Sequence, residues 1–381
     1  MKLVKQMLDV VRFQGLETER NRIVFYSEGK NYWPYLRGLI RSVIDICELE
    51  ICYVSSDSED PGLRIESEKV KSFFIGSGFM RDWFFANIKS GVIVMTMPDL
   101  NQFQIKRSTS ASVHYVYIQH SLVSMHMIYR EGAFDYFDTI FCSGPHHVKE
   151  IRAMEQLAGT PPKKIIECGY PLLDEMSETL LRDGDKNTDR AEDIDYQKHI
   201  LVAPTWGESA IIESGIGEVL VSKLLANNYR VTLRPHPETI KHSKGRVNAI
   251  VFKHSANALF SYEENIVTQT SLYESDIMLC DWSGVALEYA FGLNKPVIFI
   301  DTPRKINNPN YKNIDIEPFE ISIRNKIGVV ATIDNILEKI VLAKFDRSAV
   351  THYIFNLGSS ATIGAQALIE LASTQVGTIK R

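Results

Sequence analysis

Residues 275–292 read Ser-Asp-Ile-Met-Leu-Cys-Asp-Trp-Ser-Gly-Val-Ala-Leu-Glu-Tyr-Ala-Phe-Gly. The first six residues predict a buried strand, and residues 285–291 predict a helix that Gly292 ends. A strand that runs directly into a helix leaves the first helical N–H groups unpaired and points the positive end of the helix dipole outwards. Such a junction favours an anion, and Ser283 either caps the helix or donates to a phosphate oxygen. The alternative is a plain turn in which Asp281 and Ser283 only shape the backbone.

Strand-like and helix-like runs alternate on both sides of this junction. The expected strands are 22–26, 50–54, 73–75, 92–95, 115–118, 139–142 and 165–168 in the first half, and 199–203, 230–233, 250–252, 276–280 and 296–300 in the second. Expected helices include 34–46, 79–89 and 146–157. This alternation predicts an α/β protein with parallel sheets covered by helices on both faces.

A polar stretch, residues 182–197, has almost nothing to bury and predicts a domain boundary. We therefore expect a Rossmann-like domain of residues 1–185 and a charged linker of residues 186–198. A second Rossmann-like domain of residues 199–360 and a helical tail of residues 361–381 follow. Two doubly wound domains in tandem place the carboxyl ends of their strands around a central cleft.

The composition excludes several classes of function. The 381 residues carry a formal net charge of −5, which argues against a general nucleic-acid binder. No GxGxxG or GxxxxGK[ST] motif is present, and the histidines and cysteines lack metal-ligand spacing, so we expect no cofactor and no metal. The five scattered cysteines are typical of reduced core residues. We find no signal-peptide core and no run of about 18 apolar residues, and expect a cytoplasmic protein.

Near the N-terminus, apolar residues recur at helical spacing: Leu3, Val4, Met7, Leu8 and Val11. Such a helix either packs on the domain or lies on a membrane surface. We favour packing, because the stretch is short and not strongly basic.

Arg234-Pro235-His236-Pro237 follows a predicted strand. Residues two apart in an extended segment point the same way, so Arg234 and His236 share a face, and the prolines keep the segment stiff. An arginine fork beside an imidazole suits a phosphate. The alternative is a rigid loop whose arginine pairs with a surface carboxylate.

Two further strand ends carry candidate site residues. Thr205 and Trp206 follow the first strand of the second half, where Thr205 borders the expected cleft and Trp206 either stacks on a base or packs in the core. His120 ends the strand 115–118 and is either a general base near neutral pH or a structural histidine.

These motifs appear together in the order of a known family. They are His120, Gly-Tyr-Pro-Leu-Leu-Asp at 169–174, Ala-Pro-Thr-Trp at 203–206, Arg-Pro-His-Pro at 234–237, Asp-Trp-Ser-Gly at 281–284 and Asn-Lys-Pro at 294–296. The chain resembles the CDP-glycerol glycerophosphotransferases of teichoic acid and capsule synthesis over roughly residues 115–301. The family's His-Gly-Thr reads His120-Ser121-Leu122 here, and Trp282, Gly284 and Glu288 replace a tyrosine, a second serine and an aspartate.

The resemblance implies the GT-B fold, with two Rossmann-like domains facing a central cleft, and a transferase without cofactor. It implies a CDP-linked polyol as donor, a glycan or lipid-linked acceptor, and work at the inner membrane face. The implied roles fall on eight residues: His120 as base, His236 as proton donor to the leaving CMP, Arg234, Ser283 and Gly284 on the pyrophosphate, Thr205 and Asp281 in support, and Glu288 on a donor hydroxyl.

Two other functions stay open on the residues. A GT-B glycosyltransferase would use a nucleotide sugar on the same scaffold, because a fold does not determine a reaction. A non-catalytic nucleotide-binding scaffold is compatible with the changed residues after His120.

Overall fold

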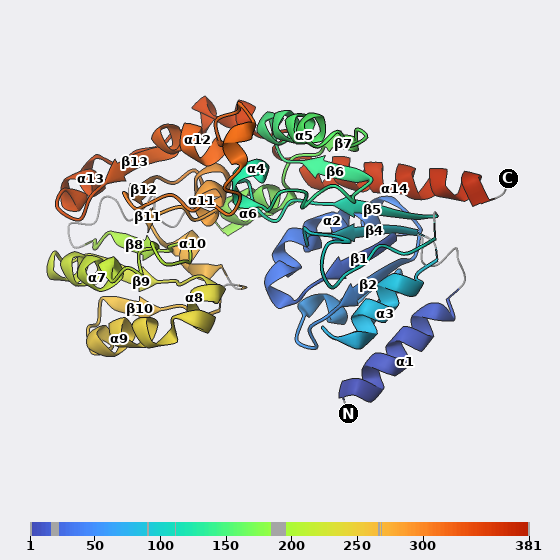
Figure 1. Cartoon of the computed structure of the whole chain (residues 1–381). Coiled ribbons are helices and arrows are strands. Elements are labelled where there is room, and N and C mark those ends of the chain that lie inside the picture. Colours follow the sequence, from blue (N-terminus) through green and yellow to red (C-terminus); the bar gives the residue numbers. More distant parts are fainter. Residues whose placement is uncertain are drawn as a thin grey trace.

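The computed structural model describes residues 2–16, 23–89, 91–110, 112–183, 196–265, 267 and 269–379. In this part of the chain, two parallel sheets lie side by side, each covered by helices (Figure 1). The strands of the first sheet are β1 (Ile23–Ser27), β2 (Ile51–Ser55), β3 (Val70–Phe74), β4 (Gly91–Met95), β5 (Val113–Tyr117), β6 (Thr139–Cys142) and β7 (Lys164–Glu167). Those of the second are β8 (His199–Val202), β9 (Arg230–Leu233), β10 (Phe260–Tyr262), β11 (Ile277–Cys280), β12 (Val297–Ile300) and β13 (Gly328–Ala331). We call each sheet with its helices the first lobe and the second lobe.

The strand orders are β3-β2-β1-β4-β5-β6-β7 and β10-β9-β8-β11-β12-β13. Each order reverses direction once, between β1 and β4 in the first sheet and between β8 and β11 in the second. Ligands of open α/β sheets bind at such reversals, outside the carboxyl ends of the strands. The predicted pair of doubly wound α/β domains is confirmed, and the loops after β8 and β11 hold two of the predicted motifs, Ala203–Trp206 and Asp281–Gly284.

Central strands are buried along their whole length, as in β1, β4 and β11. Helices cover both faces, so these strands read as continuous apolar runs. The helices of the first half are α1 (Lys2–Gln14), α2 (Trp33–Ile46), α3 (Phe79–Asn87), α4 (Met125–Ile128), α5 (Pro145–Ala158) and α6 (Pro171–Asp183). The later helices are α7 (Ile216–Ala226), α8 (Pro237–His242), α9 (Lys244–His254), α10 (Thr270–Glu274), α11 (Val285–Leu293), α12 (Phe319–Ile327), α13 (Ile336–Leu342) and α14 (Ser360–Ile379).

The last helix, α14, returns to the first lobe. It packs along α2 and reaches β4 and β1, as Figure 1 shows. Ala365 and Leu368 of α14 share a core with Leu36 and Leu39 of α2. The tail that the sequence predicts is therefore part of the core of the lobe that opens the chain.

One predicted strand is wrong. Residues 250–252 belong to α9, in which Val247 and Ile250 face the core while Phe252 is exposed. Three apolar residues in a row look like a short strand, but the buried positions follow the helical period. The edge strands of this sheet are β10 and β13, and the sequence prediction missed both.

The first helix has two different faces. Val10 and Phe13 of α1 are buried in the core of the first lobe, and the carboxylate of Asp9 accepts a hydrogen bond from the Phe74 N–H at 3.0 Å. The packing that we favoured is therefore real, although an apolar outer face remains exposed. None of the helices in the described residues has both the length and the hydrophobicity of a membrane span.

Most of the predicted linker 186–198, together with the boundary at residue 185, lies outside the described residues, which resume at Tyr196. All five cysteines are free thiols, four of them buried, as their apolar surroundings predict.

Candidate active site

A cleft with a volume of about 570 Å³ opens between the two lobes. The loops after β1 and β5 line it from the first lobe, and the loops after β8, β9, β11 and β12 line it from the second. Seven of the eight predicted site residues line this cleft: His120, Thr205, Arg234, His236, Ser283, Gly284 and Glu288. Strand order explains the convergence, because β8 and β11 are neighbours at the reversal of the second sheet.

The eighth residue, Asp281, lies beneath the cleft and is fully buried. One carboxylate oxygen accepts hydrogen bonds from the N–H groups of Thr205 and Trp282, at 2.7 and 2.8 Å. The other accepts from the Ile211 N–H at 2.9 Å. Burial raises the pKa of Asp281, and these three donors oppose that shift. Asp281 thus fixes the loop after β8 against the start of α11.

The start of α11 does not have the cap that one reading of the sequence suggested. Gly284 occupies the N-cap position, and no side chain caps the helix there. The mostly buried Ser283 instead lines the cleft. A helix of nine residues with its amino end at the cleft directs the positive end of its dipole towards a bound anion.

Arg234 and His236 follow β9 and reach the cleft from one side, as their spacing predicts. Arg234 is mostly buried, and its Nε lies 3.7 Å from a carboxylate oxygen of Glu263. Nδ1 of His236 accepts a hydrogen bond from the Glu238 N–H at 3.1 Å, which leaves the proton of the neutral ring on Nε2. Burial, aided by Lys305 and Arg234, lowers the pKa of His236 to about 3. His236 is therefore a neutral hydrogen-bond donor near pH 7.

Glu288 lies in the first turn of α11 and lines the cleft. The Tyr170 hydroxyl of the first lobe donates a hydrogen bond to Glu288 Oε1 at 2.9 Å. Burial raises the pKa of Glu288 to about 7, and the Tyr170 hydrogen bond and Arg234 oppose this shift. The carboxyl group is therefore close to half ionised at neutral pH.

His120 lines the cleft from the first lobe. Its Nδ1 is 3.3 Å from the Tyr117 hydroxyl, and the ring also forms a hydrogen bond with the backbone of Thr96. Burial lowers the pKa of His120 to about 4, so the ring is neutral near pH 7. A neutral imidazole can accept a proton.

Sequence reasoning missed several residues of the cleft. Tyr32, Tyr35 and Tyr129 surround His120, with ring centroids 5.8, 6.2 and 5.9 Å from the imidazole. Lys305, in the loop after β12, is an additional cation. No motif marks these residues, because they come to the cleft from separate segments of the chain. The strand end 297–300 was the one signal that could have drawn attention to Lys305.

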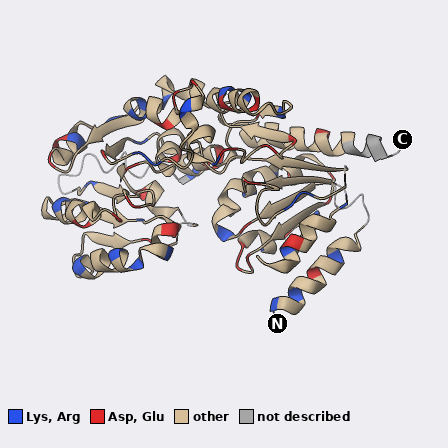
Figure 2. Ribbon diagram, viewed as in Figure 1, with Lys and Arg blue, Asp and Glu red and all other residues tan. Residues whose placement is uncertain are grey.

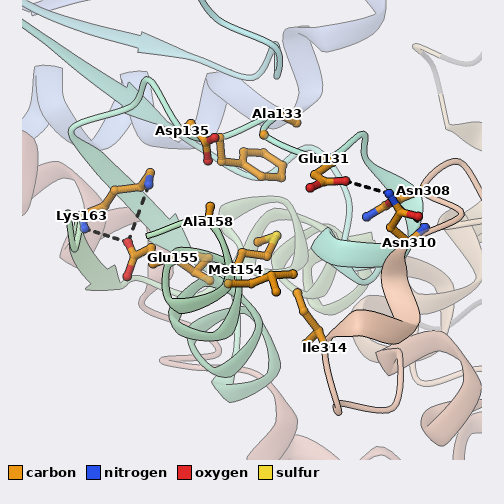
Figure 3. A pocket seen from close by; sticks show the side chains of 14 residues that line it. Glu131, Ala133, Asp135, Met154, Glu155, Ala158, Lys163, Asn308, Asn310 and Ile314 are labelled. Carbon is orange, nitrogen blue, oxygen red and sulfur yellow. Dashed lines mark hydrogen bonds and ion pairs between the residues drawn. The ribbon is translucent and has the colours of Figure 1, made fainter. Parts of the chain in front are cut away.

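A second, much smaller pocket, of about 40 Å³, lies between α5 and the loop around Asn308 (Figure 3). Its walls include Phe134, Met154 and Ile314. Two of its carboxylates are engaged, since Glu131 accepts a hydrogen bond from the Asn310 amide at 3.0 Å and Glu155 lies 3.8 Å from Lys163 Nζ. In the described residues we also find no cluster of three or more His, Cys, Asp or Glu side chains that could hold a metal ion.

Comparison with known proteins identifies the family of the chain. Residues 15–305 match the model of a family described as CDP-glycerol:poly(glycerophosphate) glycerophosphotransferase. No curated protein sequence matches the chain.

Solved structures share its fold. The H444N variant of the wall teichoic acid polymerase TagF superposes with a TM-score of 0.61 at 11% identity, covering 99% of this chain and 95% of the other. The same variant soaked with CDPG gives a TM-score of 0.58 at 14% identity, covering 98% and 94%. A UDP-GlcNAc 2-epimerase from Neisseria meningitidis bound to UDP-GlcNAc gives 0.57 at 12% identity, covering 91% and 99%. At these identities the similarity shows the GT-B-like fold alone.

Proposed function

The chain belongs to the CDP-glycerol:poly(glycerophosphate) glycerophosphotransferase family and is an enzyme that transfers glycerol phosphate from CDP-glycerol to a polymer, and we propose that the cleft between its lobes is the active site. The observation that carries this proposal is the convergence of His120 from one lobe with Arg234, His236 and the start of α11 from the other. Phosphoryl transfer needs positioned cations and hydrogen-bond donors around the phosphates, together with a group that takes the acceptor proton.

In the proposed reaction, an acceptor hydroxyl attacks the phosphorus nearer the glycerol. A new P–O bond forms to the acceptor, and the P–O bond to CMP breaks with its electron pair on the CMP oxygen. His120 takes the acceptor proton. Burial lowers its pKa, and the negative charge of a donor bound nearby would raise it, which strengthens the base where it is needed.

The pyrophosphate would lie at the amino end of α11. Arg234, Ser283 and the Gly284 amide would hold its oxygens, and His236 would donate from Nε2. His236 is neutral near pH 7 without the donor, and the charge of the pyrophosphate would raise its pKa as it raises that of His120, which suits the proton transfer to CMP that the resemblance implied. Thr205 and Asp281 would support this site through the loop after β8.

Glu288 would bind a hydroxyl of the glycerol. One of its oxygens already accepts from Tyr170, so this contact would also connect the donor to the first lobe. A carboxylate at this place selects a donor with a free hydroxyl within reach.

We further propose that the acceptor is presented at a membrane, with the protein bound peripherally through α1. Leu3, Val4, Met7, Leu8 and Val11 are 52–66% exposed on the outer face of α1. Lys2, Lys5 and Arg12 accompany them, and Figure 2 shows how far the basic residues extend along α1. An apolar face with basic flanks suits the interface of an anionic bilayer.

The direct test of the proposed function is product analysis. Purified protein is incubated with CDP-glycerol and a poly(glycerophosphate) primer, and the products are separated. Release of CMP with growth of the primer by phosphodiester units supports the proposal. Turnover of a nucleotide sugar with release of a nucleoside diphosphate would instead identify a glycosyltransferase, and tight CDP-glycerol binding without turnover would identify a scaffold.

A further inference from the structure

Lys305 enters the cleft from the loop after β12. Its Nζ lies 4.2 Å from the centroid of the Trp206 ring and donates a hydrogen bond to Thr205 Oγ1 at 3.4 Å. The side chain is half-buried, so part of its charge has lost contact with water. The predicted site did not include this residue.

No carboxylate of the described residues forms an ion pair with Lys305. The buried carboxylate beneath the loop, Asp281, already accepts from three backbone N–H groups. Asp281, Glu213 and Glu238 raise the pKa of Lys305 from a distance, but burial outweighs them and lowers it to about 8. A partly desolvated ammonium that no carboxylate of the described residues contacts directly, in a cleft that Arg234 also lines, is suited to an anionic ligand.

Trp206 holds this lysine in place. The Trp206 side chain is 36% exposed, so it is not packed in the core. Lys305 covers one face of its indole, so that face is not open for stacking on a base. The His236 ring lies 6.1 Å away at an angle of 33°. A cation over an indole face is stabilised without being neutralised, so Lys305 keeps its charge for a ligand.

We propose that Lys305 is a second cationic ligand of the donor diphosphate, alongside Arg234, and that it leaves the Trp206 face for a phosphate oxygen when the nucleotide binds. The inference rests on the proposed use of the cleft for CDP-glycerol. During transfer, negative charge moves onto the CMP phosphate as its bond to the glycerol phosphate breaks. An ammonium on that phosphate stabilises the leaving group without giving up a proton.

The test measures CDP affinity by calorimetry, which needs no turnover. Lys305→Met should weaken CDP binding by about 10- to 100-fold, the usual effect of losing a hydrogen bond to a charged group. The matched control is Lys312→Met, which removes a lysine that lies 6.0 Å from the Tyr311 ring and outside the cleft. Lys312→Met should bind CDP like the wild type, and melting curves confirm that both variants are folded.

The pH dependence separates a ligand role from a structural one. Lys305 is charged below its pKa of about 8 and neutral above it, so CDP affinity of the wild type should fall between about pH 7.5 and 9.5. Lys305→Arg keeps its charge over this range, and its affinity should remain high and flat. Lys305→Met should be weak and flat.

Unchanged CDP affinity in Lys305→Met would overturn the inference, and so would a fall at high pH that Lys305→Arg shares with the wild type. The proposed function fails on a different result, which is a wild type that binds CDP but does not transfer glycerol phosphate. If the wild type does not bind CDP, both the role of Lys305 and the proposed function of the cleft are wrong.

Discussion

Gly284 of the second lobe lies directly against Ser121 of the first. A Cβ built at position 284 would be 2.5 Å from Ser121 Oγ and 3.4 Å from Val123 Cγ1. Gly284 has an ordinary right-handed backbone conformation, so the glycine is required by this close approach and not by its dihedral angles. The two lobes therefore meet where the proposed phosphate site begins.

Gly284→Ala should disturb the cleft more than the fold. If Ser121 moves with its lobe to relieve the clash, the neighbouring His120 is misplaced, whereas rotation of its hydroxyl alone would leave His120 in place and the activity unchanged. We expect transfer activity to fall by about 10- to 100-fold with a small shift in melting temperature. Ser121→Gly in the same chain removes the obstruction and should restore most of the activity.

Gly245→Ala is the control for Gly284→Ala, because nothing lies within 4 Å of a Cβ added at position 245. It should leave activity unchanged and raise helix stability slightly. If the double variant with Gly284→Ala and Ser121→Gly stays as slow as Gly284→Ala alone, the contact between the lobes is not the cause.

His120→Ala should abolish most of the transfer, by about 10²- to 10⁴-fold, because a general base is lost. CDP affinity should stay within a few-fold of the wild type, since His120 is proposed to contact the acceptor rather than the nucleotide. Initial rates with CDP-glycerol and calorimetry with CDP check the two parts. The control is His352→Ala, because His352 is exposed, and it should keep the wild-type rate. A His120→Ala enzyme with normal rates would show that His120 is not the base.

The sequence predicted the second-lobe half of the site well, and for a physical reason. Arg234, Thr205 and Ser283 each follow a parallel strand, and the carboxyl ends of such strands meet at one edge of the sheet. Local pattern is enough there. The stretch 250–252 was misread as a strand because three apolar residues are too few to distinguish the alternation of a strand from the periodicity of a helix.

The first-lobe half of the cleft could not be predicted in the same way. Tyr32 and Tyr35, at the start of α2, come near His120 from a segment that lies far from it in the sequence, and Tyr129 does so from the end of α4. Lys305 likewise reaches Trp206 across about a hundred residues. These contacts depend on how the segments of each lobe are placed, which no short-range pattern encodes.

Glu288→Gln should distinguish glycerol recognition from nucleotide recognition. We expect the KM for CDP-glycerol to rise by about tenfold, because a hydrogen bond to a charged acceptor is lost. CDP carries no glycerol, so its affinity should be unchanged. The control is Glu175→Gln, which affects a carboxylate bonded to Arg37 away from the cleft. Equal losses for CDP and CDP-glycerol would place Glu288 on the nucleotide instead.

Stability should fall as pH rises through about 7. Glu320 is buried, its Oε2 accepts from the Ser124 N–H at 2.9 Å, and burial raises its pKa from 4.5 to about 7. The folded protein therefore binds more protons than the unfolded chain between these values, and the stability present at low pH is lost as Glu320 ionises. Glu320→Gln keeps the acceptor oxygen without the charge.

Urea unfolding at about pH 5 and pH 8 checks this effect. The wild type should lose on the order of 1–3 kcal/mol more than Glu320→Gln between the two conditions. Glu288, which accepts a hydrogen bond from Tyr170, is unchanged in both proteins, so its own contribution to the pH dependence is common to them. Identical pH dependence in wild type and variant would show that Glu320 ionises without cost.

The outer face of α1 should bind anionic vesicles. Charging it with Met7→Glu and Leu8→Glu places carboxylates where the apolar contact would form, and we expect vesicle sedimentation to drop by at least about tenfold. Val10 and Phe13 on the buried face are untouched, so the fold and the transfer to a short water-soluble primer should be kept. Phe252→Glu is the matched control, because Phe252 is 86% exposed on α9 of the other lobe. If Phe252→Glu reduces sedimentation as strongly as the double change in α1, or if the double change has no effect, the membrane contact lies elsewhere on the molecule.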